Sequence, residues 1–304
     1  MAKKNDTTFR TSIGGQALIE GILMRGPQKQ AIVVRAPEGL VIREEELKLV
    51  RDKYPILGLP LIRGSVTFLD SMFKGVKALM FSADYFPEEE ESSAEPSKFE
   101  RWLNEKLGNE KMEKLIIAVA VVLSVLFSIG LFMLLPTSIA GLVEYFTDSV
   151  LVRNLVDAVL RIAIFMTYLA LVSRMKDIRR VFSYHGAEHK SIHCYEKGLE
   201  LTVENVRKQS KHHPRCGTSF LMVVIIVAIL TNTAVFAVFP PANLLIRILV
   251  QLLMLPVVVG IAYEFNRYVG AHDNPVTAFL AKPGMWMQKF TTYEPDDSMI
   301  EVAI

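Results

Sequence analysis

Cysteine is scarce in this chain, and neither sign of charge predominates. Two cysteines, Cys194 and Cys216, occur among 304 residues, which is too few for a disulfide framework. Lysine and arginine together number 34 against 32 aspartates and glutamates, which gives a formal net charge of +2. Proteins dedicated to nucleic acids are usually clearly basic. The composition therefore argues against a nucleic-acid partner.

An apolar segment is also missing from the start of the sequence. Met1–Gly15 includes two lysines, but no run of hydrophobic residues follows them. A secretory signal peptide needs such a run of about 7–15 residues after its positive end. We therefore expect no signal peptide and a cytoplasmic N-terminus.

Long apolar runs are what the sequence does have, since 51% of its residues are hydrophobic. About 20 consecutive apolar residues can cross the hydrocarbon core of a bilayer as a helix. Asp157 and Arg161 interrupt one run, but they are four residues apart and could pair on one helix face. A Pro-Pro-Ala-Asn link makes the last two runs an antiparallel pair. We predict four transmembrane helices, at residues 115–135, 155–172, 220–239 and 244–263.

The loops between these runs differ in positive charge. Residues 136–150 contain no lysine or arginine, whereas residues 174–219 contain ten. Because cytoplasmic loops carry the excess of lysine and arginine, we expect the 174–219 loop and both termini on the cytoplasmic side. The sequence thus predicts a multi-pass protein of the bacterial inner (cytoplasmic) membrane. Its expected partners are the lipid bilayer and, as candidates, other membrane proteins; its oligomeric state stays open.

The segment before the first predicted span, residues 1–86, is expected to form a small α+β unit. Short runs at Ala31–Arg35 and Leu40–Glu44 flank an Ala-Pro-Glu-Gly turn and predict a hairpin. Glu45–Tyr54 is expected to form a short helix. Ser65–Asp84 has the wide apolar face of a helix that either lies in the membrane interface or packs on the N-terminal unit. The sequence leaves these two alternatives open.

The other boundaries follow from composition. Residues 87–97 are acidic with proline and serine, which predicts a disordered linker. Residues 98–304 then form the membrane domain, ending in a polar cytoplasmic tail at 265–304. The expected fold class is a mainly α membrane protein with four transmembrane helices, a small N-terminal α+β cytoplasmic unit and an amphipathic interfacial helix. In the first unit, Glu20 and Arg25 could face a site, but we interpret them as ordinary polar positions of a half-buried strand.

One short stretch of the positive loop contains three of the six histidines, His185, His189 and His193. His185, Glu188 and His189 form the pattern H-x-x-E-H, and at about 100° per residue Glu196 falls on the same helix face. Two histidines four residues apart can bind one zinc ion, while a nearby glutamate takes a proton from water. The same pattern marks the inverted zinc proteases. The alternative is a solvated helix face with ordinary polar residues.

Two further segments bring potential ligands to the same membrane surface. His213 and Cys216 lie directly before the third predicted span, and Glu264 lies at the end of the fourth. Carboxylates near a membrane are costly and often functional. This convergence makes a metal site the favoured interpretation.

We expect the ligands to be His185 and His189, with Glu188 as the general base and Glu264 as the third ligand. His213 and Cys216 are alternatives for the third place, since two histidines and a cysteine also suit zinc. Cys216 could instead be a small buried residue. Arg215 is a catalytic candidate that could hold an anionic group, or it could be a positive anchor of the cytoplasmic loop.

Several motifs resemble those of the YqhQ family of bacterial membrane proteins. They are GGQALIEGILMRGP, YHGAEHK, ELTVENVR, HPRCGTSF, the Tyr-Glu pair at 263–264 and PGMWMQKFTTYEPDD. The resemblance runs over residues 13–304 and implies a multi-span inner-membrane protein of a family often labelled a predicted metal-dependent enzyme. It supports treating the candidate residues as one set but supplies no reaction. The acidic linker and His193 look peculiar to this chain, so we do not count His193 as a ligand.

Three functions remain in order of preference. The first is a membrane-embedded, zinc-dependent hydrolase that acts on a membrane-associated peptide or a lipid-linked substrate. The second is a non-enzymatic assembly or insertion factor for membrane proteins, with a structural metal or polar site. The third is a metal-ion carrier, which we rank last because the predicted spans hold few acidic residues or histidines.

Overall fold

The computed structural model describes residues 9, 11–48, 53–86, 109–272 and 274–304. The chain divides into two compact units, one comprising Met1–Phe86 and Leu169–Ile304 and the other Pro87–Tyr168. The predicted acidic linker at 87–97 lies outside the described residues. Each unit is described by itself below.

A four-stranded antiparallel sheet with the order β1-β2-β3-β4 forms one part of the first unit. Its last hairpin is confirmed, with the turn before Gly39, whose φ of 135° only glycine adopts easily. The predicted helix at Glu45–Tyr54 is wrong at its start, because Glu45 and Glu46 pair with β3 instead. The strands are β1 (Gly14–Leu18), β2 (Gly21–Arg25), β3 (Lys29–Ala36) and β4 (Gly39–Glu46).

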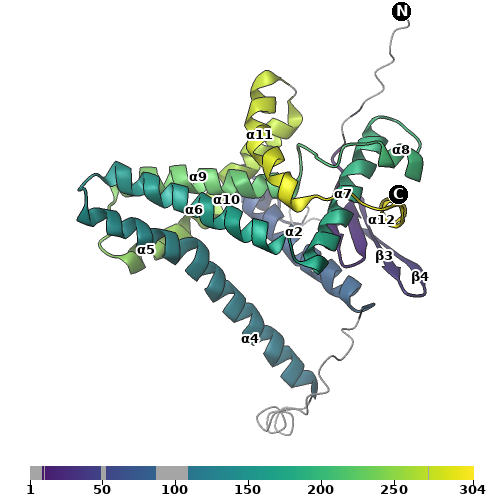
Figure 1. Cartoon of the computed structure of the whole chain (residues 1–304), viewed down its shortest axis with the longest axis horizontal. Coiled ribbons are helices and arrows are strands. Elements are labelled where there is room, and N and C mark those ends of the chain that lie inside the picture. The colour runs from purple at the N-terminus through teal and green to yellow at the C-terminus, as the bar shows by residue number, and fades with distance from the viewer. Residues whose placement is uncertain (1–8, 10, 49–52, 87–108, 273) are drawn as a thin grey trace, which may run out of the picture. The chain divides into compact units, whose positions relative to one another are not determined.

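Helices cover both faces of this sheet, as Figure 1 shows. Side chains alternate between the faces of a strand, so Ile22 and Leu23 of β2 enter different clusters. Ile22 packs against Tyr184 of α7 (Lys176–Glu196) and against α12 (Asp297–Ala303). Leu23 packs with Ala78 of α2 (Ile62–Ala83) on the other face. The sheet is therefore the layer between the H-x-x-E-H helix and the predicted amphipathic helix.

Helix α2, which follows the short 3₁₀ turn η1 (Pro55–Gly58), packs on the N-terminal unit, which was one of the two alternatives, and its place in a membrane interface stays a prediction. One side packs on the sheet through Ala78 and Ser82, both buried. The opposite side leaves an apolar face exposed, as a helix in a membrane interface would. The exposed side chains are Leu69, Met72, Phe73, Val76 and Met80.

Close contact between α2 and α10 (Leu244–Ala271) depends on two glycines. A β-carbon on Gly64 would lie 2.7 Å from Cβ of Tyr263 and 2.9 Å from Cα of Gly260. Neither neighbour can rotate away, because both atoms are fixed to the α10 backbone. We expect Gly64→Ala to destabilise the protein by about 1–3 kcal/mol, the usual effect of overpacking. Thermal unfolding in detergent measures this, with Gly58→Ala as the control, because a β-carbon on Gly58 meets nothing within 4 Å. Equal midpoints for the two variants would contradict the tight packing.

The second unit holds the first two long apolar helices. Helix α4 (Asn109–Ile129) continues through a π-helical turn, η2 (Gly130–Leu134), into α5 (Leu135–Gly141), and η3 (Leu142–Tyr145) follows. The sequence predicts that the first span ends before Pro136, but the wide π turn lets the helix pass this proline. In α6 (Val150–Val172), Asp157 and Arg161 form the predicted ion pair at 2.9 Å.

The other two long helices, α9 (Gly217–Val238) and α10, lie side by side in the first unit. Altogether the described residues contain four helices long and apolar enough to cross a membrane, as predicted. The fourth continues past the predicted end at 263, so Glu264 lies within α10 and not at its end. The four candidate spans are Val119–Gly141, Leu151–Val172, Gly217–Val238 and Leu244–Ala271.

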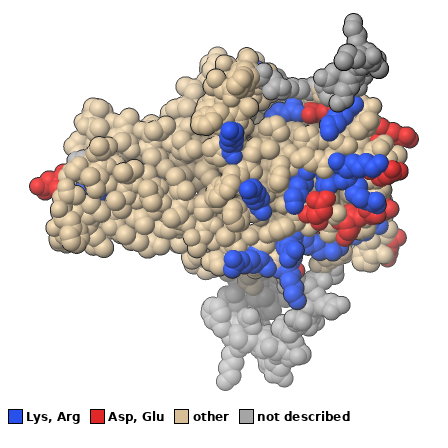
Figure 2. Space-filling model, turned by 45° about the horizontal axis from the view of Figure 1, so that its top comes forward, with Lys and Arg blue, Asp and Glu red and all other residues tan. Residues whose placement is uncertain are grey.

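The predicted polar tail is folded. Asn274 caps α11 (Pro275–Thr291) in a capping box with Thr277, and α11 then packs along α9. Helix α12 packs with α7 and with the short helix α8 (Val203–Arg207). Figure 2 shows charged side chains gathered over the end with the sheet, α7 and α12, while the surface of the long apolar helices is almost free of them.

Candidate metal site

Helix α7 carries the H-x-x-E-H pattern through the interior of the first unit. Residues 183–192 are all buried, although several of them are polar. They are covered by the sheet on one side and by the turn before α9 on another. The alternative of a solvated helix face is therefore wrong, and each buried polar side chain requires a partner.

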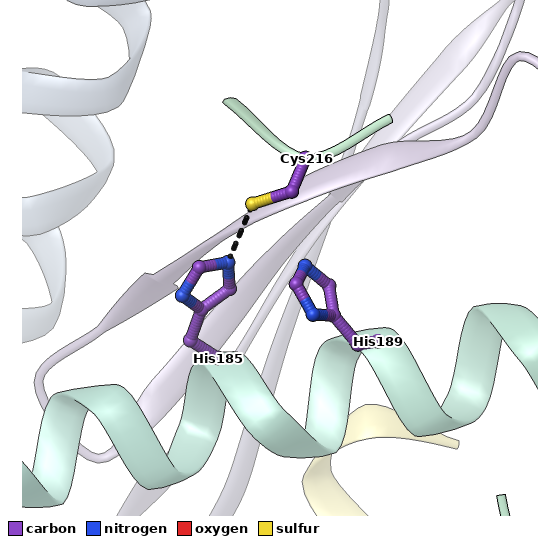
Figure 3. A group of neighbouring side chains, drawn as sticks. All are labelled: His185, His189 and Cys216. Carbon is purple, nitrogen blue, oxygen red and sulfur yellow. Dashed lines mark hydrogen bonds between the residues drawn. The ribbon is translucent and has the colours of Figure 1, made fainter. Parts of the chain in front are cut away.

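His185, His189 and Cys216 meet at one point, shown in Figure 3. Their ligand atoms all lie within 4.8 Å of one another, and Nε2 of His185 is 3.1 Å from Sγ of Cys216. Cys216 is the N-cap of α9, and its sulfur accepts a hydrogen bond from the N–H of Thr218. The end of one candidate span is thereby joined to the middle of α7.

Backbone carbonyls fix the orientation of both imidazoles. Nδ1 of His185 lies 2.8 Å from the carbonyl oxygen of Thr291, and Nδ1 of His189 lies 2.6 Å from that of Lys211. A carbonyl only accepts, so each Nδ1 carries the proton and each Nε2 keeps its lone pair. Burial also lowers the pKa of His189, which keeps this ring neutral at neutral pH. This is how proteins prepare histidines to bind a metal.

Glu188 projects from the same helix into the same space. Its side chain is 4% exposed, and the backbone N–H of Gly15 in β1 donates to its carboxylate. Its Oε2 has no hydrogen-bond partner among the described residues. Burial raises the pKa of this carboxyl group. A carboxylate with one free oxygen and a raised pKa is suited to accept a proton.

A cavity of about 370 Å³ adjoins these four side chains. Its other walls come from β1, from α7 and from the turn that precedes α9. Its size is within the usual range of small-molecule sites. The side chains of His185, Glu188, His189 and Cys216 therefore line a space large enough for a small molecule.

A second group, which the sequence does not predict as a unit, lies beside the first. His193, Glu196 and His213 also place ligand atoms within 4.8 Å of one another. Arg215 donates to Glu196 and, through NH1, to the carbonyl of Thr11 at 2.6 Å. The anionic partner of Arg215 is thus the protein's own glutamate.

The protonation states in this second group are consistent with an ion pair between Glu196 and Arg215. Burial opposes ionisation of Glu196, but hydrogen bonds from Thr11 and Arg215 keep its pKa below the usual value. Burial lowers the pKa of His213 to about 3. Because a guanidinium already neutralises the carboxylate, we assign this group to holding the turn and not to a second metal. The periodicity of α7 places Glu196 on the correct face, but the partner arginine lies in a distant segment.

Gln288 of α11 fixes the turn that supplies His213 and Cys216. Its Oε1 accepts from the N–H of His213 at 2.8 Å, and its Nε2 donates to the His213 carbonyl at 2.7 Å and to Oγ of Ser219 at 2.9 Å. The side chain is fully buried. No sequence pattern signals this contact, since Gln288 lies in the segment predicted to be a polar tail.

Glu264 does not join the group around Cys216. Its two carboxylate oxygens lie 2.6 and 2.5 Å from Nε and NH2 of Arg63 in α2. A guanidinium and a carboxylate in this two-point geometry form a strong pair. The expected third ligand is thus occupied by an arginine, while Cys216, the alternative, is the residue that lies beside both histidines.

This arrangement predicts an effect of Glu264 on stability and none on metal content. Glu264→Gln should lower the thermal midpoint, because Arg63 loses its carboxylate and α2 loses an anchor on α10. The same variant should have the metal content of wild type. Metal analysis and thermal unfolding of one preparation check both. A loss of metal with an unchanged midpoint would contradict this prediction and would indicate that Glu264 is a metal ligand.

Comparison with known proteins places the chain in a family. The model of the family described as "Protein of unknown function (DUF1385)" matches residues 59–304, and the chain belongs to this family. It is also 34% identical over 299 residues to "Uncharacterized protein YqhQ" of Bacillus subtilis (strain 168), covering 96% of this chain and 89% of the relative. The resemblance inferred from the motifs is confirmed. No solved structure shows a significant match.

Proposed function

We propose that this protein is a membrane-bound, zinc-dependent hydrolase whose metal ligands are His185, His189 and Cys216. One observation carries the proposal. Nε2 of His189 is buried and has no hydrogen-bond partner of normal geometry among the described residues, yet it lies within 4.8 Å of two other ligand atoms. A lone pair buried in this way is costly unless something binds it. A cation at this point would bind it together with His185 and Cys216.

The donor set suits zinc and a catalytic use of it. Zinc binds both imidazole nitrogen and cysteine thiolate, and catalytic zinc sites have three protein ligands with a fourth position open. The cavity of about 370 Å³ lies against these atoms, so a fourth ligand has room to enter. When bound, the ion acts as a Lewis acid that makes water nucleophilic at neutral pH.

Residues of the chain itself accept the proton and hold the catalytic groups in position. Glu188 has a free oxygen in the cavity and takes the proton from the attacking water as general base. The N–H of Gly15 holds the other part of this carboxylate in place. Arg215 acts as a positioning residue, because its bonds to Glu196 and Thr11 hold the turn that presents Cys216. A substrate amide or ester would bind in the cavity, which β1 and this turn line.

The site lies at the end of the α9–α10 pair, since Cys216 caps the start of α9. With the positive 174–219 loop on the inner side, this end faces the cytoplasm and both termini are cytoplasmic. The substrate is then a peptide or a lipid-linked molecule at the inner surface of the bacterial cytoplasmic membrane. Helix α2, with its exposed apolar face, lies in the interface beside the site.

Metal analysis of purified protein tests the proposal. We expect about one zinc per wild-type chain and none in a variant that carries both His185→Ala and His189→Ala. The control is His272→Ala, because this histidine lies at the C-terminal end of α10, where its Nδ1 donates to the carbonyl of Tyr268, and it belongs to neither group of potential ligands. Wild type without metal, or a double variant with as much zinc as wild type, would overturn the proposal.

A second candidate is a non-enzymatic assembly factor in which the metal has a structural role. The observation in its favour is that His185, His189 and Cys216 tie α7 to α9, α11 and the intervening turn. A metal at this point would hold four segments together. The two candidates differ at Glu188. If Glu188→Gln complements a deletion strain as well as wild type and His185→Ala does not, the structural role holds.

A further inference from the structure

A second cavity, of about 440 Å³, lies directly beside the candidate metal site. The two cavities share Gly14, Gly15 and Gln16 of β1 and Gly217 at the start of α9. A β-carbon on Gly14 or on Gly217 would meet nothing within 4 Å, whereas one on Gly15 would lie 2.8 Å from Cδ of Glu188. A molecule that fills one cavity can therefore pass into the other beside Gly14 and Gly217.

Arg25 of β2 lines this second cavity and forms no ion pair with a carboxylate of the described residues. Its NH1 donates to the hydroxyl of Ser71 at 3.0 Å, and its Nε is buried without any hydrogen-bond partner in the part of the chain that the structure describes. Seven other arginines of the described residues form ion pairs with carboxylates. These pairs are Arg35–Glu301, Arg43–Glu45, Arg63–Glu264, Arg161–Asp157, Arg180–Glu20, Arg207–Asp297 and Arg215–Glu196.

Asp70 is the acidic residue that lines the same cavity, and its negative charge attracts the guanidinium of Arg25. Its carboxylate accepts a hydrogen bond from Nζ of Lys74 at 2.7 Å, one helical turn along α2. The pair Asp70–Lys74 is neutral as a whole. The guanidinium of Arg25, which is always protonated in proteins, therefore has no carboxylate of its own in the cavity.

The position of the cavity on α2 points to the membrane surface. At about 100° per residue, the cavity-lining residues Thr67 and Asp70 lie to one side of the apolar face of α2 that remains exposed, and Val66 borders that face. If that apolar face rests in the interface, the cavity opens at the depth of lipid headgroups. Headgroup phosphates are the anions present at that depth.

We propose that the second cavity is the binding site for a phosphate-bearing group, held by the guanidinium of Arg25 and the hydroxyl of Ser71. Arginine presents a planar pair of donors that matches two oxygens of a phosphate. The remaining length of the same molecule extends past Gly14 and Gly217 toward Glu188 and Cys216. Only the extension toward Glu188 and Cys216 rests on the proposed function. Anion binding at Arg25 does not depend on it.

Direct binding measurements test the site without any assay of turnover. Wild type in neutral detergent is titrated with phosphatidylglycerol, with diacylglycerol of the same acyl chains, which lacks the phosphate, and with inorganic phosphate, and occupancy is read by native mass spectrometry and calorimetry. We expect phosphatidylglycerol to bind at least about 10-fold more tightly than diacylglycerol, as one charge-assisted contact allows. If inorganic phosphate binds at Arg25 and the two lipids bind alike, the phosphate group is confirmed and a soluble phosphorylated ligand is its source.

Variants decide whether Arg25 is responsible. Arg25→Gln should lose about 10-fold in affinity for the bound anion, while its zinc content stays that of wild type. The matched control is Arg43→Gln, which removes an arginine of strand β4 in the same sheet that already pairs with Glu45. Should Arg25→Gln fail to fold, Arg25→Lys keeps the charge without the paired donors and should bind several-fold more weakly. Anion affinity equal to wild type in the folded variant, or no anion binding by wild type, would overturn the inference whatever the zinc content.

Discussion

Glu188→Gln is expected to retain its zinc and to lose about 10²–10⁴-fold of the hydrolytic rate, the usual contribution of a general base. The substitution keeps the shape of the side chain and its contact with the N–H of Gly15. It removes the free carboxylate oxygen that would accept the proton. Because Glu188 is not in the ligand group, metal binding should be unaffected.

The measurement can be made before the substrate is identified. Membranes from cells that lack the protein, express wild type or express Glu188→Gln are compared by mass spectrometry of their peptides and lipids. Species that wild type consumes should persist with Glu188→Gln, and the purified species then gives the rate ratio. Glu204→Gln, in the short helix α8, is the matched control. Identical profiles for wild type and Glu188→Gln would contradict a hydrolytic role.

Cys216→Ala is expected to weaken zinc binding by more than about 100-fold. Loss of a residue that only supports a ligand already costs about 10- to 100-fold in affinity, and Cys216 would supply one of three ligand atoms. Competition with a chelator of known affinity measures the change. Cobalt-loaded wild type should also show a sulfur-to-metal charge-transfer band that Cys216→Ala lacks.

The chain offers a matched control in its other cysteine. Cys194 is also buried, but it packs with Val206 and Ile300 and is not in the ligand group. Cys194→Ala should leave both the affinity and the cobalt band unchanged. Equal losses in the two variants would mean that the cysteines act through packing and not through the metal.

Much of the fold could be predicted because its signals are local. A run of about 20 apolar residues suffices to indicate a spanning helix, and all four predicted runs correspond to candidate spans, although the first and fourth end later than predicted, at Gly141 and Ala271. The spacing of His185 and His189 depends on helical periodicity alone, so their shared direction could be predicted as well. Cys216 is a candidate from sequence because it lies directly before a predicted span.

What the sequence could not provide depends on contacts between distant segments. By sequence, Glu264 and Cys216 both suit the third ligand position, and only the pairing of Glu264 with Arg63, 201 residues away, separates them. Hydropathy also cannot reveal the hydrogen bonds of Gln288, because a glutamine has the same hydropathy whether it is buried or exposed. Arg25 resembles an ordinary strand residue for the same reason, since its lack of a paired carboxylate is visible only in three dimensions.

X-ray absorption spectroscopy of the zinc-loaded protein tests the central claim most directly, because it counts the sulfur and nitrogen atoms around the metal. The arrangement of His185, His189 and Cys216 predicts one sulfur and two imidazole nitrogens per zinc, with the sulfur missing in Cys216→Ala. A wild-type spectrum with only nitrogen and oxygen neighbours would contradict it.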